Sequence, residues 1–260
     1  MSELRRGTRS RHERLLALLR AGTTHVDALA AALDVSPSTV RRDLGRLTRQ
    51  GAVTRTYGGA VTAAAFHERE LSERVRLEPA AKAAIGAAAA GLLPESGTVF
   101  LDSGSTCARL AEHLPGRAGL TVVTRSPEIA LFLAGAAGLE VVLVGGSVTA
   151  KSHGLVGPLV ALALDRLVVD VAFLGGDAVH PVLGVGEPTL PEAAVKEKVA
   201  ERARRVVVLA DATKLAPHAV PCWAPLPAGW VLVTDETDAE VLDPYRAAGV
   251  AVVGVAPGRP

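Results

Sequence analysis

Residues 35–44 read VSPSTVRRDL, and this stretch decides how the N-terminal part of the chain folds. Ser36 suits a helix N-cap because its hydroxyl can accept a hydrogen bond from an otherwise free backbone N–H group. Pro37 fits the first position of the helix, and Gly51 is suited to end it near residue 50. Apolar side chains recur every three or four residues and predict one buried stripe, which consists of Val40, Leu44 and Leu47.

The segments on either side of this helix complete a small domain. Apolar residues with helical spacing predict two shorter helices before it, over residues 11–20 and 26–33. After it, residues 52–61 read AVTRTYGGAV, which is typical of a short β-hairpin that turns at Gly58 and Gly59. Three helices followed by a hairpin predict a winged helix-turn-helix domain over residues 1–61.

The outward face of the third helix has the chemistry that a helix needs in the major groove of DNA. Hydroxyl and guanidinium groups can bond base edges and phosphates, and small residues at the helix start permit close approach. A solvated basic face on a purely structural helix is the alternative, but the cap, the preceding helix and the hairpin together favour DNA binding. The predicted DNA contacts are Ser36, Ser38, Thr39, Arg41, Arg42, Arg46 and Arg49 on the helix and Arg55 on the hairpin.

The charge of the chain is divided unevenly along its length. Residues 1–61 hold 11 Lys and Arg against 5 Asp and Glu, a balance of +6. Residues 62–260 hold 17 against 22, a balance of −5, so the whole chain carries only +1. A basic N-terminal part on an acidic body is consistent with a polyanionic partner for that part, although a solvated basic tail would look the same.

The composition also predicts a location. Cys107 and Cys222 are too few for a disulfide framework, and the arginines near the N-terminus have no apolar segment behind them that would make a signal peptide. No apolar stretch is long enough to span a bilayer. We therefore expect a cytoplasmic protein with no membrane partner. No group of His, Cys, Asp and Glu residues has metal-site spacing, and we expect no metal and no cofactor.

The rest of the chain predicts an α/β domain. Residues 62–79 are charged and poor in large apolar side chains, which predicts a linker. From residue 80 to 260, short Val- and Leu-rich runs alternate with helical segments, as in a Rossmann-like domain whose parallel strands are buried on both faces. The predicted strands are 98–101, 121–123, 140–144, 171–174, 205–210, 231–234 and, as an additional last strand, 249–255.

Glycines, hydroxyl groups and charges follow nearly every predicted strand, and ligands of parallel α/β sheets bind at the carboxyl ends of the strands. The sharpest segment is DSGST at residues 102–106, where Gly104 permits a tight turn before a helix. Backbone N–H groups at such a helix start can hold a phosphate. A normally capped helix is the alternative, but Arg125 and Lys214 at neighbouring strand ends favour a site for an anion.

Both parts of the chain resemble the DeoR family of transcriptional regulators. VSPSTVRRDL and the GGA at residues 58–60 match the recognition helix and wing of that family. Segments that match its sensor domain include DSGST at 102–106, DVAFLG at 170–175, EAAVK at 192–196 and DATK at 211–214. The resemblance implies operator binding by the third helix and a sensor domain similar in fold to ribose-5-phosphate isomerase. It also implies a phosphorylated sugar or related metabolite as effector, repression relieved by that effector, and a dimer or tetramer.

The strand ends and the family resemblance together predict one effector site. Arg125 stands where the family usually has Asn, and this added positive charge suggests a more anionic effector or a displaced phosphate. The charged helix around Lys196 is expected to face solvent for the most part, although Lys196 itself matches the family. Asp43 is expected to orient the recognition helix, because a carboxylate facing phosphates would repel them. The predicted effector-binding residues are Asp102, Ser103, Gly104, Ser105, Thr106, Thr124, Arg125, Gly145, Gly146, Gly175, Asp177, Lys196, Asp211 and Lys214.

Two other functions stay open. The first is a sugar-phosphate isomerase that carries a DNA-binding head. The isomerases that this domain resembles use a D-G-A-D-E segment after the corresponding strand, whereas residues 175–179 read GGDAV, so we expect binding without turnover. The second is an architectural DNA binder that responds to no ligand, which the polar strand ends disfavour.

Overall fold

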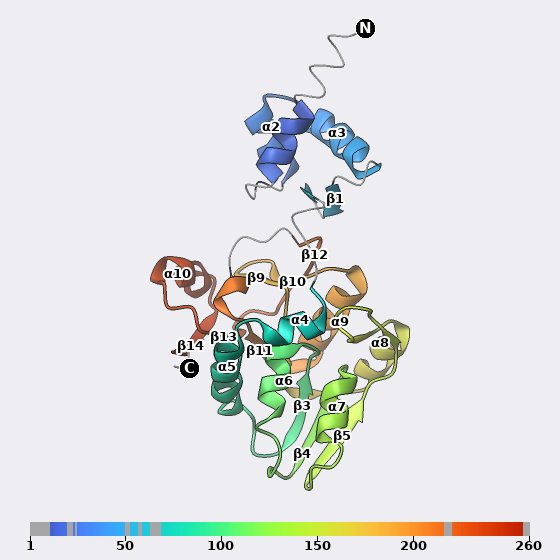
Figure 1. Cartoon of the computed structure of the whole chain (residues 1–260), viewed down its shortest axis with the longest axis vertical. Coiled ribbons are helices and arrows are strands. Elements are labelled where there is room, and N and C mark those ends of the chain that lie inside the picture. The colour runs from blue at the N-terminus through green and yellow to red at the C-terminus, as the bar shows by residue number, and fades with distance from the viewer. Residues whose placement is uncertain are drawn as a thin grey trace. The chain divides into compact units, whose positions relative to one another are not determined.

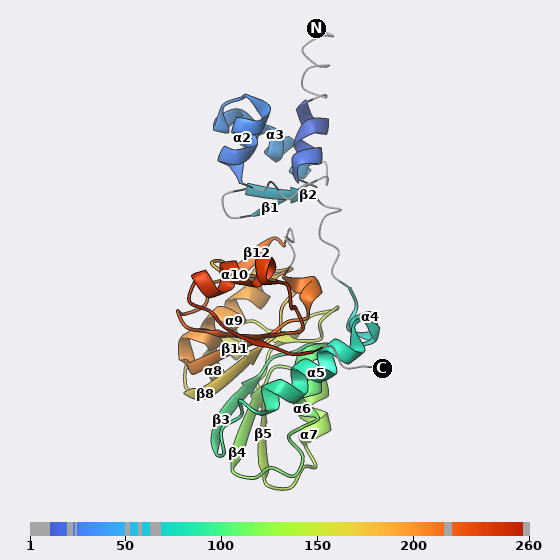
Figure 2. The ribbon, with the colours of Figure 1, turned by 90° about the vertical axis from the view of Figure 1, so that its left-hand side faces the viewer.

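The computed structural model describes residues 11–19, 23, 25–49, 53–56, 59–62, 69–215 and 220–256, without the side chains of residues 49, 54–56 and 59–62. The chain forms two compact units. The first comprises Met1–His67 with Pro217–Cys222, and the second comprises Glu68–Ala216 with Trp223–Pro260. Figures 1 and 2 show the helices and strands of both units, which we describe one at a time.

The first unit is the predicted helical domain with a hairpin. It consists of a helix over residues 11–19, α2 (Val26–Leu33), α3 (Pro37–Arg49) and the antiparallel strands β1 (Val53–Thr56) and β2 (Gly59–Thr62). Thr56 lies opposite Gly59 in this hairpin, and the turn itself lies outside the described residues. These elements confirm the winged helix-turn-helix. The buried core of the unit includes the predicted stripe of α3 and consists of Leu15, Leu19, Val26, Leu29, Ala30, Leu33, Val40, Leu44, Leu47 and Val53.

A seven-stranded sheet forms the centre of the second unit, and all of its neighbouring strands are parallel. The seven strands that the sequence predicted are all present, with ends that differ by a few residues. In the order of the sheet they are β14 (Ala251–Gly254), β13 (Val231–Thr234), β11 (Ala203–Leu209), β8 (Val169–Leu174), β3 (Gly97–Leu101), β4 (Leu120–Thr124) and β5 (Leu139–Leu143).

Helices cover both faces of this sheet. On one face α5 (Pro79–Ala90), α6 (Ser105–Ala111) and α7 (Pro127–Leu133) pack over side chains such as Val99 and Leu101. On the other face α8 (Pro158–Leu164), α9 (Leu190–Arg202) and α10 (Ala239–Ala247) share a core with Phe100. Alternate residues of β3 therefore face opposite cores, as a central strand requires. Among the described residues, no helix combines the length and the apolar character needed to cross a lipid bilayer.

Short strands that the sequence did not predict form two further sheets. β9 (Ala178–His180) pairs with β10 (Gly184–Glu187), and β12 (Cys222–Ala224) lies beside β10. β6 (Ser147–Val148) pairs with β7 (Leu155–Val156). A further short helix, α4 (Leu71–Arg76), lies within the segment predicted as a linker.

The order of the strands creates a switch point between β3 and β8. From β3 the chain continues outward through β4 to β5, and the later strands β8, β11, β13 and β14 extend the sheet in the opposite direction. A crevice for ligands forms outside the carboxyl ends of the strands at such a point. The residues that follow β3 and β8, Asp102 and Gly175, therefore lie where a ligand is expected.

Candidate functional site

Hydroxyl groups gather at the start of α3. Ser36 caps the helix as predicted, because its Oγ accepts a hydrogen bond from the backbone N–H of Thr39 at 3.2 Å. The Ser36 hydroxyl also lies 2.8 Å from that of Ser38 and 2.9 Å from that of Thr39. Asp34, with φ of 53°, makes the tight turn between α2 and α3. This end of the helix offers hydroxyls and backbone N–H groups to a phosphate oxygen.

The predicted basic face of α3 is exposed. Arg41, Arg42 and Arg46 are exposed side chains, while Val40 and Leu44 on the opposite side are buried. A helix with this division can present its guanidinium groups to base edges and phosphates. The backbones of Arg49 and Arg55 lie in α3 and β1, but their side chains are outside the described part of the chain, so their DNA contacts stay predictions.

Asp43 holds the first helix against α3 and is buried. Its Oδ2 accepts a hydrogen bond from Arg11 Nε at 2.6 Å, and its Oδ1 lies 3.2 Å from His12 Nε2. Burial by itself would raise the pKa of Asp43, but the bonds from Arg11 and His12 outweigh it and lower that pKa. The carboxylate therefore orients the recognition helix, which agrees with the role expected for it.

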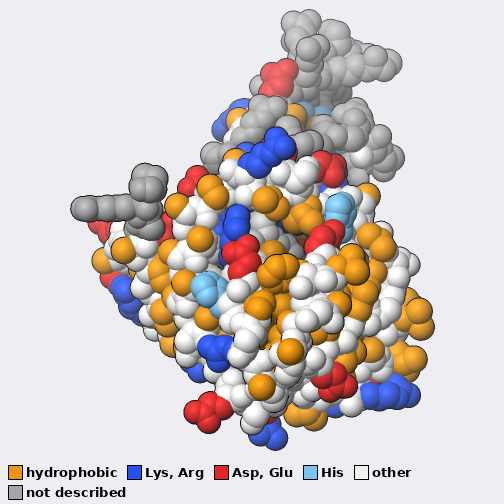
Figure 3. All heavy atoms as spheres, turned by 60° about the horizontal axis from the view of Figure 1, so that its bottom comes forward, with side chains coloured by type: hydrophobic (Ala, Val, Ile, Leu, Met, Phe, Trp, Pro, Cys, Tyr) orange, Lys and Arg blue, Asp and Glu red, His pale blue; other side chains and the backbone are white. Residues whose placement is uncertain are grey.

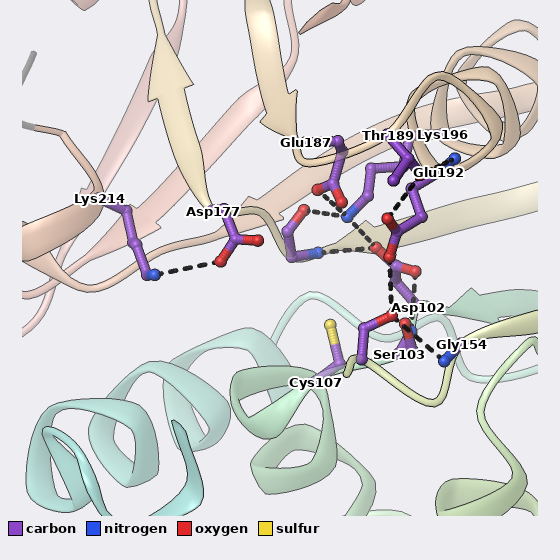
Figure 4. A network of polar contacts seen from close by, with 12 residues as sticks. Asp102, Ser103, Cys107, Gly154, Asp177, Glu187, Thr189, Glu192, Lys196 and Lys214 are labelled. Atoms are coloured by element: carbon purple, nitrogen blue, oxygen red, sulfur yellow. Dashed lines mark hydrogen bonds and ion pairs between the residues drawn. The ribbon is translucent and has the colours of Figure 1, made fainter. Parts of the chain in front are cut away.

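Asp102 is the centre of the polar network in the second unit (Figure 4). It is fully buried after β3. Its Oδ1 accepts hydrogen bonds from Arg125 Nε at 2.5 Å and from the Ser103 N–H at 2.8 Å. Its Oδ2 accepts hydrogen bonds from Lys196 Nζ at 2.6 Å and from the Gly175 N–H at 3.2 Å. One carboxylate thus joins the ends of β3, β4 and β8 to helix α9.

The buried network around Asp102 contains two cations, Arg125 and Lys196, and two carboxylates, Asp102 and Glu187. Lys196 Nζ lies 2.7 Å from Glu187 Oε1 as well as beside Asp102. Burial would raise the pKa of Asp102, but the charges of Arg125 and Lys196 hold it down to about 2. Burial raises the pKa of Glu187 to about 7 against the opposing charge of Lys196, and the carboxylates of Asp177 and Asp102 add to the increase.

Arg125 lies in the interior and not on a ligand-facing surface. It is only 1% exposed, and its Nη1 donates to the carbonyl of Leu155 at 3.4 Å in addition to its bond with Asp102. A Cβ on Gly154 would collide with the Arg125 guanidinium and with Ser103 Oγ, so the loop backbone packs directly against both. The charge of Arg125 is paired with Asp102, so it does not supply the free positive charge that the sequence suggested.

The loop after β3 has the tight turn that the sequence predicted. Gly104 has φ of 122°, a conformation that favours glycine, and α6 begins directly after it at Ser105. No side chain caps this helix. Ser103 is buried, whereas Ser105 and Thr106 are partly exposed.

A second group of charges surrounds Asp177, at the other end of the polar network in Figure 4. Asp177 Oδ1 accepts a hydrogen bond from Arg74 Nη1 at 3.2 Å and lies 3.5 Å from Lys214 Nζ. The side chains of Arg74 and Lys214 are 15% and 26% exposed. Lys82 lies near them and donates to the carbonyls of Arg74 and Leu77, both at 2.6 Å. These cations give the edge of the sheet the charge that an anionic ligand needs.

Four other predicted effector residues have structural contacts in this conformation. The hydroxyl of Thr124 donates to a carbonyl of β3 at 2.7 Å, and Asp211 caps the short turn η1 (Ala212–Lys214). Gly145 and Gly146 are exposed, and a Cβ on Gly146 would come within 2.6 Å of a carbonyl of β7. Direct contact of these four residues with an effector stays a prediction.

Lys196 was among the predicted effector residues, whereas sequence reasoning missed Glu187 and Glu192 as members of this network. Glu192 and Lys196 are both buried, unlike most charged residues of α9, and Glu192 accepts hydrogen bonds from Ser152 and Thr189, each at 2.7 Å. Glu187 was not predicted at all. The spacing of four between Glu192 and Lys196 places both on one face of α9, next to the buried Val195 and Val199, and this was the available signal.

Both units match models of known protein families. Residues 77–236 match the DeoR C terminal sensor domain, and residues 11–65 match the DeoR-like helix-turn-helix domain. The chain belongs to the DeoR family. The second unit is therefore a DeoR sensor domain, and the first is a DeoR-like DNA-binding domain.

Relatives of this DeoR-family chain are named as transcriptional regulators. The HTH-type transcriptional regulator GlpR of Haloferax volcanii is 34% identical over 234 residues, which cover 89% of this chain and 91% of that protein. The HTH-type transcriptional repressor GlcR of Bacillus subtilis is 32% identical over 86% of this chain and 88% of its own length. The glycerol-3-phosphate regulon repressor of Haemophilus influenzae is 28% identical over 81% and 82%.

Solved structures with a similar chain path are distant. The full-length sorbitol operon regulator SorC of Klebsiella pneumoniae has a TM-score of 0.39 at 18% identity, over 89% of this chain and 97% of that one. Ribose 5-phosphate isomerase A of Neisseria gonorrhoeae has a TM-score of 0.39 at 19% identity, over 54% and 55%.

Proposed function

We propose that this DeoR-family chain is a sequence-specific repressor of carbohydrate genes, controlled by a phosphorylated sugar or related metabolite. The observation that carries the effector half is the pair of partly exposed cations, Arg74 and Lys214, that meet at Asp177 beside the switch point of the sheet. Anions are the ligands that such a cluster binds. The name of the glycerol-3-phosphate regulon repressor, a relative, is consistent with a phosphorylated effector.

The DNA half of the proposal rests on the division of α3 into two faces. Its apolar stripe is buried, Asp43 fixes its orientation, and Arg41, Arg42 and Arg46 are exposed. We propose that the hydroxyls of Ser36, Ser38 and Thr39 and these guanidinium groups contact the operator, together with Arg49 and Arg55. The bonds to phosphates make the affinity depend strongly on salt.

Catalysis by the sensor domain is the alternative that we disfavour. In the loop after β8, residues 175–179, the only carboxylate is Asp177, and it is paired with Arg74 and Lys214. A general base needs a carboxylate free to take a proton from the substrate. We therefore propose binding without turnover, and measurable isomerisation of any pentose or hexose phosphate by the purified protein would overturn that.

We also propose that the protein acts as a homo-oligomer, a dimer or a tetramer, because two heads are needed for two operator half-sites. Exposed apolar side chains of the sensor domain support this, since such surfaces mark association sites. Hydrophobic side chains are prominent on the face drawn in Figure 3. The exposed large apolar residues of α7, α8 and the edge strand β5 are Leu131, Phe132, Leu159, Leu162 and Leu143.

The test is a titration of the purified chain onto DNA from upstream of its own gene, with and without a panel of sugar phosphates. We expect salt-sensitive binding that one phosphosugar releases. If the protein binds the DNA specifically but no sugar phosphate in the panel changes that binding, the DNA-binding function stands and the proposal of a phosphosugar effector is wrong. If no specific binding occurred at any salt concentration, the proposed operator next to the gene would be wrong.

A further inference from the structure

The hairpin of β6 and β7 belongs to a flap, residues 145–157, that connects the end of β5 to the start of α8. Its two strands are each only two residues long, and Val148 in β6 is 61% exposed. Glycines lie at both ends of the flap, where Gly146 and Gly157 have φ of 155° and 104°. Such residues at the ends of a short, exposed hairpin can absorb the φ and ψ changes of a hinge.

The loop at the tip of the flap lies across the carboxyl ends of β3 and β4. Gly154 packs directly against Ser103 Oγ and the Arg125 guanidinium, with no room for a Cβ between them. The Leu155 N–H donates to the Arg125 carbonyl at 2.9 Å. Figure 4 shows Gly154 beside Ser103 and Asp102. In this conformation the flap is therefore closed over the strand ends that hold the buried Asp102.

Two side-chain contacts hold the tip of the flap in this position. His153 Nδ1 lies 2.6 Å from Glu128 Oε1 on α7, and both side chains are about half exposed. Ser152 Oγ donates to Glu192 Oε1 on α9 at 2.7 Å. His153 has φ of 55°, a left-handed conformation that residues other than glycine rarely adopt and that persists where surrounding contacts hold it. These two contacts therefore latch the flap in its closed position.

A third contact joins the flap to helix α4. The N–H of Leu71, the first residue of α4, donates to the Lys151 carbonyl at the tip of the flap at 2.9 Å. The C-terminal end of the helix is held separately, by bonds of Arg74 with Lys82 and Asp177. None of the residues of α4 is buried. The position of its N-terminal end therefore depends on the bond to the flap.

We propose that the flap and α4 form a conformational switch: when the tip of the flap leaves the ends of β3 and β4, the bond between Leu71 and Lys151 breaks and the N-terminal end of α4 is released. Helix α4 lies between residues 11–65, which match the helix-turn-helix domain, and residues 77–236, which match the sensor domain. Opening of the flap is thereby transmitted to the segment that joins the two domains. The switch does not depend on which residues recognise an effector, so it goes beyond the proposed function.

Hydrogen exchange of the full-length free protein, measured on peptides by mass spectrometry, tests the latch. Glu128→Ala removes the carboxylate that contacts His153. We expect backbone exchange about twofold to fivefold faster in the flap and, by a similar factor, in the first turn of α4, because loss of an exposed ion pair opens both segments together. Glu240→Ala removes an exposed acid at the second residue of α10, as Glu128 is of α7, and this matched control should change neither. Faster exchange confined to the flap, or no change in either segment, would overturn the proposal.

A second variant, Leu71→Pro, tests the bond between α4 and the flap. Proline lacks the N–H that donates to Lys151 but fits the first position of a helix, and ψ of 147° at Glu70 suits a residue before proline. Leu71→Ala keeps this N–H and is the matched control. We expect the flap to exchange about twofold to tenfold faster in Leu71→Pro than in Leu71→Ala, with exchange of the central strand β3 the same in both. Equal exchange of the flap in the two variants would overturn the proposal, and so would an equal increase in β3, which would mean that the whole domain had loosened.

Discussion

The charge of Glu187 affects the stability of the sensor domain near neutral pH. Its pKa is raised from an ordinary value of 4.5 to about 7, so folding favours its protonated form. The stabilisation from this group is present below about pH 4.5 and is lost as pH rises through about 7. The charged groups around it are Lys196, Asp102, Asp177 and Arg125.

We expect the free energy of unfolding of the parent to fall by about 3 kcal/mol more than that of Glu187→Gln between about pH 5 and pH 8. Urea unfolding followed by tryptophan fluorescence measures this. Both tryptophans, Trp223 and Trp230, lie in the sensor domain and so report on that unit. Glu201→Gln, at an exposed position of α9, is the control and should follow the parent. Parallel pH profiles of Glu187→Gln and the parent would mean that Glu187 is ionised in the folded protein throughout this range.

At the level of residues, the ends of the strands could be predicted because they follow from apolar runs, but the surroundings of several charges could not. That the residues after the strands bind an effector stays a prediction. Whether a charge faces solvent or another charge depends on long-range packing. Arg125 pairs with Asp102, 23 residues away in the chain, and Lys196 reaches the same Asp102 from 94 residues away. The local sequence does not show which partner, so far away in the chain, each of these two charges finds.

At the scale of elements, the recognition helix depends on one buried carboxylate. Asp43→Ala removes the carboxylate that accepts a hydrogen bond from Arg11 and lies beside His12, so both side chains lose this contact. We expect a loss of about 1–3 kcal/mol from the DNA-binding domain, seen as a lower thermal midpoint by calorimetry.

The matched control for that variant is Asp27→Ala. Asp27 is an exposed residue in the first turn of α2. Its removal should cost about 0.3–1 kcal/mol, the usual value of a favourable helix-end charge. Equal losses for the two variants would show that Asp43 acts as one more surface charge and does not join the helices. A smaller loss for Asp43→Ala would contradict its structural role outright.

Long and periodic elements were predictable, and short ones were not. The central strands β3, β4, β8 and β13 could be read as apolar runs because most of their side chains are buried on both faces of the sheet, and the partly exposed edge strands β5 and β14 still carry Val-rich runs. The pairs β6–β7 and β9–β10 escaped prediction because they are two to four residues long and contain glycines and exposed residues. These short pairs matter for the site, since β10 ends at Glu187 and β9 follows Asp177.

In the whole molecule, a DNA-binding domain and a sensor domain with separate cores belong to one chain. The DNA-binding domain has its own apolar core, and the sensor domain has a core on each face of its sheet. An effector can control DNA binding only if it binds one state of the protein better than another. Helix α4 is the element through which we expect that preference to act, because Arg74 ties it to Asp177.

If the protein is an effector-controlled repressor, effector binding and operator binding are coupled. Calorimetry would give the dissociation constant of the phosphosugar identified by DNA release, first for the free protein and then for the protein saturated with operator DNA. Coupling is reciprocal, so we expect weaker effector binding to the DNA complex, by the same factor by which the effector weakens DNA binding. Equal effector affinity with and without DNA would show that the two sites are not coupled and that the effector does not control this regulator.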